Sequence, residues 1–322
     1  MFPSDVPGLA ELARRTRHWP AAVETLTGDI GRRRYFRLAL PDNRTVLGVV
    51  YPKEEEDSRH RWMAARVLLH GRVRVPAVIA DDSRGNQIVE DFGPEDLSAR
   101  LASTARERAV WLGRAADAAA SIADAPDPGI NPPFDATLFR RELDLAREAV
   151  FEMLLGAPLT SAEREAHDGW VESLVAEILG HPFALCHRDF HANNLFAPDE
   201  EIAVIDFQDL RRGPDSYDLA SLLWERSTLG WMSEATAAPV TARFAMRRGI
   251  DERALAERLR RVLLQRAWKV CGTFARAVAQ GRGQTYRLYL PPELALVRRL
   301  LTNSEKDRRF AAVLKSRCAT VC

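Results

Sequence analysis

The sequence predicts an α+β protein of two lobes, a small lobe of mainly antiparallel strands followed by a larger, mainly helical lobe. In residues 1–93, short apolar runs alternate with turn signals such as Pro41-Asp42-Asn43, as expected of antiparallel strands. In residues 94–322, apolar residues instead recur at helical spacing over long segments. A chain of 322 residues is long enough for each lobe to bury a core of its own.

The elements of the small lobe follow from the same patterns. An amphipathic helix is expected first, over about residues 8–18. The turn Gly28-Asp29-Ile30-Gly31 separates the first two strands, because glycine and aspartate between apolar strands favour a hairpin. Strands are expected at 23–26, 35–40, 45–51, 75–79 and 87–91, with a second helix at about 59–70.

The large lobe is predicted to be helical apart from two short strands. Helices are expected at about 105–123, 137–155, 161–179, 215–229, 234–248 and 251–280. A proline-rich linker over 125–133 separates the first two. The strand-like stretches, 183–186 and 202–205, flank the segment that carries the most functional information.

Composition excludes several classes of function. A net charge of +1 gives no basis for binding nucleic acid. No apolar run reaches the roughly 20 residues that span a bilayer, and the N-terminus lacks the features of a signal peptide. The 4 cysteines show no metal-ligand spacing. We therefore expect a reduced, cytoplasmic protein with no membrane or nucleic-acid partner, in which Cys186 is a buried thiol; no pattern indicates an oligomeric state.

Residues 187–209 contain the three polar groups that phosphoryl transfer from ATP requires. Asp189 is followed five positions later by Asn194, and Asp206 ends an apolar strand. One carboxylate must orient the attacking hydroxyl, while an amide and a second carboxylate hold Mg²⁺ at the phosphates. The pattern predicts an ATP- and Mg²⁺-dependent kinase in which Asp189 is catalytic and Asn194 and Asp206 bind the metal. A nucleotide-binding regulatory module without turnover is the alternative.

With Gly213-Pro214 and Tyr217-Asp218-Leu219, this segment resembles the aminoglycoside-phosphotransferase superfamily, which implies a protein-kinase-like fold. The chain looks most similar to the anomeric N-acetylmuramate/N-acetylglucosamine kinases of cell-wall recycling. Three segments carry this closer resemblance: 28–37, 206–209 and 265–276. It implies that the small-molecule acceptor is the anomeric hydroxyl of an amino sugar. An aminoglycoside, an amino alcohol or another sugar stays open as the acceptor.

Candidate nucleotide-binding residues lie in two parts of the small lobe. Gly28, Asp29 and Arg34 could meet the phosphates, although the same turn could be an ordinary hairpin. Residues 90–92 (Glu90, Asp91, Phe92) fit a connector that binds adenine through its main chain, and a plain interlobe linker is the alternative. The expected strand at 46–50 lacks the lysine that protein kinases place at the phosphates. Which cation replaces it is left open.

Candidate acceptor-binding and supporting residues lie in the large lobe. His191 could reach a sugar hydroxyl or stabilise its loop, and Asp209 could face the acceptor or begin a helix. The resemblance implies that His187 supports the catalytic loop. It also implies that Asp218 accepts hydrogen bonds from the backbone around His187 and Arg188.

Overall fold

The computed structural model describes residues 2–26, 32–82, 84–281 and 286–319 of the chain. Two compact units are formed. The first comprises Met1–Thr104, Pro128–Asn131 and Ala192–Leu210, and the second comprises Ala105–Asp127, Pro132–His191 and Arg211–Cys322. Within the described residues, no helix has both the length and the apolar character that crossing a membrane requires.

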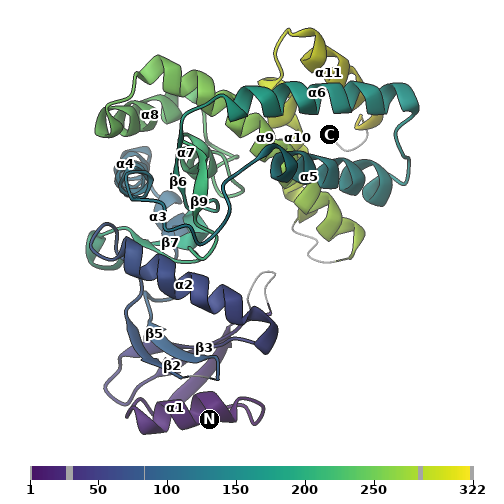
Figure 1. Ribbon diagram of the computed structural model, residues 1–322. Helices are drawn as coiled ribbons and strands as arrows, with labels where there is room; N and C mark the ends of the chain where they lie inside the picture. The colour runs from purple at the N-terminus through teal and green to yellow at the C-terminus, as the bar shows by residue number, and fades with distance from the viewer. Residues whose placement is uncertain (1, 27–31, 83, 282–285, 320–322) are drawn as a thin grey trace. The chain divides into compact units, whose positions relative to one another are not determined.

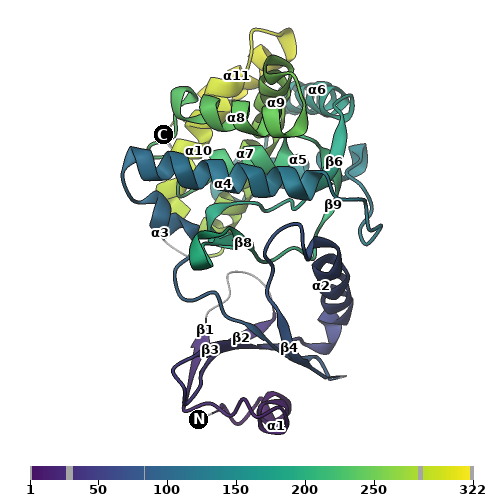
Figure 2. The same cartoon turned by 90° about the vertical axis from the view of Figure 1, so that its left-hand side faces the viewer.

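The first unit is built on a five-stranded antiparallel sheet with the order β1-β2-β3-β5-β4. The sheet lies between α1 and α2, which cover its opposite faces (Figures 1 and 2). Leu9 of α1 packs with Phe36 and Ile88 of the sheet, and all three are fully buried. The bounds are α1 (Pro7–Arg15), β1 (Ala22–Leu26), β2 (Arg34–Ala39), β3 (Thr45–Val50), α2 (Glu56–Leu69), β4 (Val78–Asp81) and β5 (Asn86–Glu90).

A short hairpin from later in the chain completes the first unit. It consists of β7 (Leu195–Phe196) and β8 (Ala203–Val204). The backbone N–H of Val204 donates to the carbonyl of Arg74 at 2.8 Å. Phe207 stacks on Trp62 of α2 with ring centroids 5.2 Å apart. Because of these contacts, the compact unit takes in residues 192–210 as well as α3 (Leu97–Leu101), and so differs from the division after residue 93 expected from the sequence.

The second unit is mainly helical and is organised around α9. This long helix packs against α5, α7 and α10. A two-stranded sheet of β6 and β9 leads into the loop of residues 187–191, and Cys186 at the end of β6 is buried as expected. The bounds are α4 (Ala105–Ala123), α5 (Ala136–Arg147), α6 (Ser161–Leu179), β6 (Phe183–Cys186), β9 (Arg211–Pro214), α7 (Tyr217–Leu223), α8 (Glu234–Arg248), α9 (Glu252–Ala279), α10 (Tyr286–Leu300) and α11 (Glu305–Arg317).

Several elements differ from the sequence expectation. The helix expected at 137–155 is α-helical only to Arg147 and continues as a π-helix, Glu148–Leu154. The helix expected at 215–229 is limited to α7, and the strand at 183–186 pairs with β9, which was not predicted. Neither α10 nor α11 was predicted. Two prolines, Pro291 and Pro292, lie inside α10, and proline normally disfavours a helix interior.

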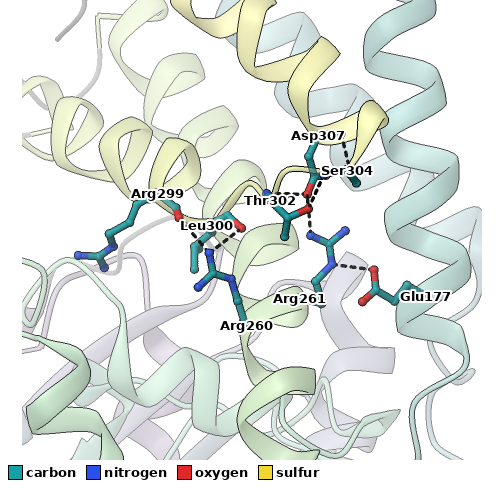
Figure 3. A network of polar contacts seen from close by, with 8 residues as sticks. All are labelled: Glu177, Arg260, Arg261, Arg299, Leu300, Thr302, Ser304 and Asp307. Atoms are coloured by element: carbon teal, nitrogen blue, oxygen red, sulfur yellow. Dashed lines mark hydrogen bonds and ion pairs between the residues drawn. The ribbon is translucent and has the colours of Figure 1, made fainter.

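A buried polar network joins α11 to α6 and α9 (Figure 3). Arg261 of α9 contacts Asp307 at 3.1 Å and Glu177 of α6 at 2.7 Å. Asp307 also accepts hydrogen bonds from the backbone N–H and the hydroxyl of Thr302, at 2.8 and 2.6 Å. The Asp307 side chain is 2% exposed, so this carboxylate depends on its protein partners for solvation.

Replacing Asp307 with alanine should lower the free energy of unfolding by about 1–3 kcal/mol, because Arg261 and Thr302 lose a buried acceptor while Arg261 keeps its ion pair with Glu177. Arg253→Ala is the control, since its ion pair with Glu257 is largely exposed. That substitution should cost less than about 1 kcal/mol. Urea unfolding measures both. Equal losses in the two variants would contradict a structural role for the network.

Candidate active site

The loop after β6 is held by a carboxylate of α7. Asp218 accepts hydrogen bonds from the backbone N–H groups of His187, at 2.6 Å to Oδ2, and of Arg188, at 2.9 Å to Oδ1. Asp218 is buried, so it satisfies two donors that water cannot reach. The prediction that Asp218 supports this loop is confirmed.

The peptide after Arg188 is held from the opposite side by α9. Arg266 donates to the carbonyl oxygen of Arg188 at 2.9 Å and to the hydroxyl of Ser221 at 2.7 Å. Arg188 itself has φ of 82°, in the left-handed region that non-glycine residues rarely adopt. Backbone strain of this kind persists where surrounding contacts hold it, and it is common at active sites. The hydrogen bonds from Asp218 and Arg266 provide that restraint.

A second group of buried polar contacts orients the side chain of Arg188. The Arg188 guanidinium donates to Glu142 of α5 at 2.9 Å, and Gln265 of α9 donates to the other oxygen of Glu142 at 2.9 Å. Lys269 lies 3.8 Å from Glu142. The sequence pattern singled out the segment 265–276 through resemblance, but it did not indicate Glu142, which is 123 residues from Gln265.

The charges around Asp189 keep it ionised. Burial acts to raise the pKa of the Asp189 carboxyl, but the positive charges of Lys269, Arg266 and Arg188 outweigh burial and hold the pKa well below its usual range. Asp189 remains partly exposed to solvent. The loop therefore presents a carboxylate that stays negative at neutral pH and can accept a hydrogen bond from a hydroxyl.

His191 lies in the same loop and is neutral at physiological pH. Its backbone N–H donates to the carbonyl of Asp189 at 3.0 Å, which forms a tight turn. Burial lowers the pKa of the His191 imidazole to about 4, against the raising effect of Asp189. A neutral imidazole can both donate and accept a hydrogen bond. Its role toward the acceptor stays a prediction.

In the first unit, the β7–β8 hairpin brings the two predicted metal ligands to one end of a small sheet. The backbone N–H of Ile205 donates to the carbonyl of Asn194 at 3.0 Å, which aligns Asn194 beside the residue preceding Asp206. Asp206 has φ of 61°, a second left-handed position. Its side chain is 37% exposed. Amide and carboxylate oxygens with this accessibility are the donor set that Mg²⁺ prefers.

Asp206 is paired with an arginine that differs from the one predicted to bind the nucleotide. Arg33 lies 3.1 Å from Asp206, whereas Arg34 pairs with the exposed Asp5 at 2.8 Å. Arg34 is the first residue of β2, and Arg33 directly precedes the strand. A contact of Arg34 with the nucleotide phosphates stays a prediction. The other residues predicted at the phosphates, Gly28 and Asp29, lie outside the described residues.

The side chains of the predicted adenine connector are occupied by contacts within the first unit. Glu90 accepts from Arg74 at 2.7 Å, and Asp91 accepts from Arg37 at 2.6 Å. The ring of Phe92 lies 6.0 Å from that of Phe196. These contacts leave the main chain as the part of the connector that can bind a base, so adenine binding there stays a prediction.

Asp209 lies in the turn before β9. Asn131 donates to the carbonyl oxygens of Gln208 and Leu210, at 2.9 Å each, and so fixes the backbone on both sides of Asp209. The sequence did not indicate Asn131, because it comes from the proline-rich linker. Whether Asp209 contacts an acceptor stays a prediction.

Comparison with known proteins shows which family the chain is similar to. Residues 22–260 match the model of the phosphotransferase enzyme family (APH). An N-acetylmuramate/N-acetylglucosamine kinase of Neisseria meningitidis serogroup B is 29% identical over 299 residues, which cover 88% of this chain and 85% of that protein.

Solved structures show the same fold. The gentamicin complex of APH(2″)-IIa has a TM-score of 0.65 at 15% identity and covers 96% of this chain and 99% of its own. The ADP-bound aminoglycoside phosphotransferase APH(2″)-Ib has a TM-score of 0.61 at 14% identity, with the same coverage. The predicted protein-kinase-like α+β fold class is confirmed.

The hydrogen bonds of Asp218 can be tested directly. In Asp218→Ala, the amides of His187 and Arg188 lose their acceptor, so their protection from hydrogen exchange should fall. The free energy of unfolding should decrease by about 2–5 kcal/mol, because two buried donors become unsatisfied. Asp251→Ala, which removes the exposed cap of α9, is the control and should cost about 1 kcal/mol without affecting exchange at 187–188. Unchanged protection of these amides in Asp218→Ala would refute the role.

Proposed function

Because the chain belongs to the phosphotransferase enzyme family, we propose that it transfers the terminal phosphate of ATP to the anomeric hydroxyl of an amino sugar, N-acetylmuramate or N-acetylglucosamine. The observation that carries this proposal is the setting of Asp189. Its loop is restrained through Asp218 and Arg266, and neighbouring cations keep its carboxylate ionised. A fixed, negative carboxylate is what a phosphotransferase needs to orient an attacking hydroxyl.

The low pKa of Asp189 suits an anomeric acceptor. A carboxylate whose pKa is depressed is a weak base, so it contributes by orienting the hydroxyl more than by removing its proton early. A hemiacetal hydroxyl is more acidic than an ordinary alcohol and needs less assistance. In the reaction, the anomeric oxygen forms a bond to the terminal phosphorus, the bond from that phosphorus to the bridging oxygen of ADP breaks, and the hydroxyl proton passes to Asp189.

Magnesium is part of the proposal. Asn194 and Asp206 would hold the ion through an amide and a carboxylate oxygen at the end of the β7–β8 hairpin. When bound, it would neutralise negative charge on the phosphate oxygens of the nucleotide. The ADP complex of a protein with the same fold supports a nucleotide as the donor.

The charges near Asp189 favour a neutral or anionic acceptor. The two α9 side chains that most lower its pKa, Lys269 and Arg266, are both cationic. A polycationic antibiotic would be repelled by them, whereas the lactyl carboxylate of N-acetylmuramate would be attracted. Lys269 is the better placed to meet such a group, because its side chain is 21% exposed while Arg266 is buried.

Replacing Asp189 with asparagine should lower kcat about 10²- to 10⁴-fold, because the acceptor hydroxyl loses its positioned proton acceptor. Binding of Mg·ATP should be little affected. Asp42→Asn, which changes an exposed carboxylate between β2 and β3, is the matched control and should keep full activity. Steady-state kinetics with the sugar acceptor and calorimetry with Mg·ATP separate the two effects. Near-normal turnover in Asp189→Asn would exclude it as the catalytic residue.

The acceptor itself can be identified from the product. We expect a sugar 1-phosphate, formed faster from N-acetylated hexosamines than from glucose, because a site that pairs the N-acetyl group discriminates against sugars lacking it. Phosphorus NMR distinguishes a phosphate on C1 from one on C6. A C6 phosphate, or turnover of an aminoglycoside with neither amino sugar reacting, would rule out this acceptor and leave the phosphotransferase activity in place.

A further inference from the structure

We propose that Arg33 binds the phosphates of ATP in place of the lysine that is missing from β3, an assignment that rests on the proposed function. The strand β3 reads Thr-Val-Leu-Gly-Val-Val and carries no cation. Lys53 is the one lysine in the sequence before residue 269, and it is exposed in the short helical turn before α2. The cation must therefore come from another position.

Arg33 makes the contacts that would be expected of such a cation. Its Nη2 lies 3.1 Å from Oδ1 of Asp206, and its Nε lies 3.4 Å from Oε2 of Glu55, the residue directly before α2. Protein kinases pair the strand lysine with a helix glutamate at the phosphate site. In this chain Arg33, directly before β2, supplies the cation, and Glu55, directly before α2, supplies the carboxylate.

The environment of Arg33 leaves capacity for a ligand. Its Nη1 is 3.5 Å from the Gln208 side chain, at the limit of a hydrogen bond, so this nitrogen keeps capacity to donate to a ligand. The guanidinium lies 6.0 Å from the ring of Tyr35 and 6.0 Å from that of Tyr51, which limit its movement. A planar guanidinium can contact a carboxylate and a phosphate oxygen at once, which a lysine amine does less well.

The neighbouring arginines have other partners. Arg34 pairs with the exposed Asp5, and Arg37 donates to Asp91 and to the carbonyl oxygen of Gly93 at 2.9 Å. Of the arginines in β2 and directly before it, Arg33 is therefore the one whose described contacts include Asp206, the proposed metal ligand. This contact places the Arg33 guanidinium beside Asp206, near the proposed position of the nucleotide phosphates.

The test compares nucleotide with nucleoside binding by calorimetry. Mg·ATP and adenosine are titrated separately into the full-length wild type, Arg33→Gln, Arg33→Lys, Arg34→Gln and the control Arg44→Gln. Arg44 is exposed and pairs with Asp42 in the turn after β2. In Arg33→Gln the affinity for Mg·ATP should fall about tenfold or more, as expected for a lost charge-assisted hydrogen bond, with adenosine binding unchanged. Arg33→Lys should restore part of it, and Arg44→Gln should match the wild type.

The outcomes distinguish this assignment from the proposed function. Wild-type affinity for Mg·ATP in Arg33→Gln would overturn the assignment alone. An equal loss of affinity for adenosine in Arg33→Gln would also overturn it, because that result indicates general damage to the first unit. A loss of Mg·ATP affinity confined to Arg34→Gln would overturn it as well. A wild-type protein that binds no Mg·ATP would overturn the proposed function and this assignment with it. Thermal unfolding of each variant confirms that the compared proteins are folded.

Discussion

The loop of residues 187–191 depends on the two hydrogen bonds that Asp218 accepts from its backbone. Arg188 adopts a left-handed conformation that is unfavourable by about 1–3 kcal/mol, and nothing in the local sequence compensates for it. Asp218 on one side and Arg266 on the other supply the compensation through hydrogen bonds to consecutive backbone groups. Because Asp189 directly follows the restrained residue, a buried carboxylate of α7 helps to fix the backbone from which this candidate catalytic side chain projects.

Both candidate functional carboxylates have arginine neighbours from distant parts of the chain. Asp189 is surrounded by cations of α9 and by Arg188, and Asp206 is paired with Arg33. Asp206 also lies at a left-handed backbone position, like the residue before Asp189. In each case a strained backbone and a nearby cation occur together. An arginine can hold a carboxylate in a defined orientation while keeping it charged, which suits both an acceptor-orienting group and a metal ligand.

The long helix α9 connects the core of the second unit to the loop of residues 187–191. Arg261 on this helix contacts the buried Asp307, and one turn later Gln265 and Arg266 contact Glu142 and the loop. The network that anchors α11 and the contacts that restrain the loop therefore lie on the same helix.

The sequence by itself determined the fold class and most helix positions, and it indicated Asp189, Asn194 and Asp206 as candidate site residues, because spacing along the chain carries that information. Tertiary structure alone decided which arginine accompanies Asp206, because the two partners are 173 residues apart in the sequence. It also revealed Glu142 and Asn131, whose partners are distant in sequence. The short strand β9 and the proline-containing α10 were missed because packing, rather than local propensity, stabilises them.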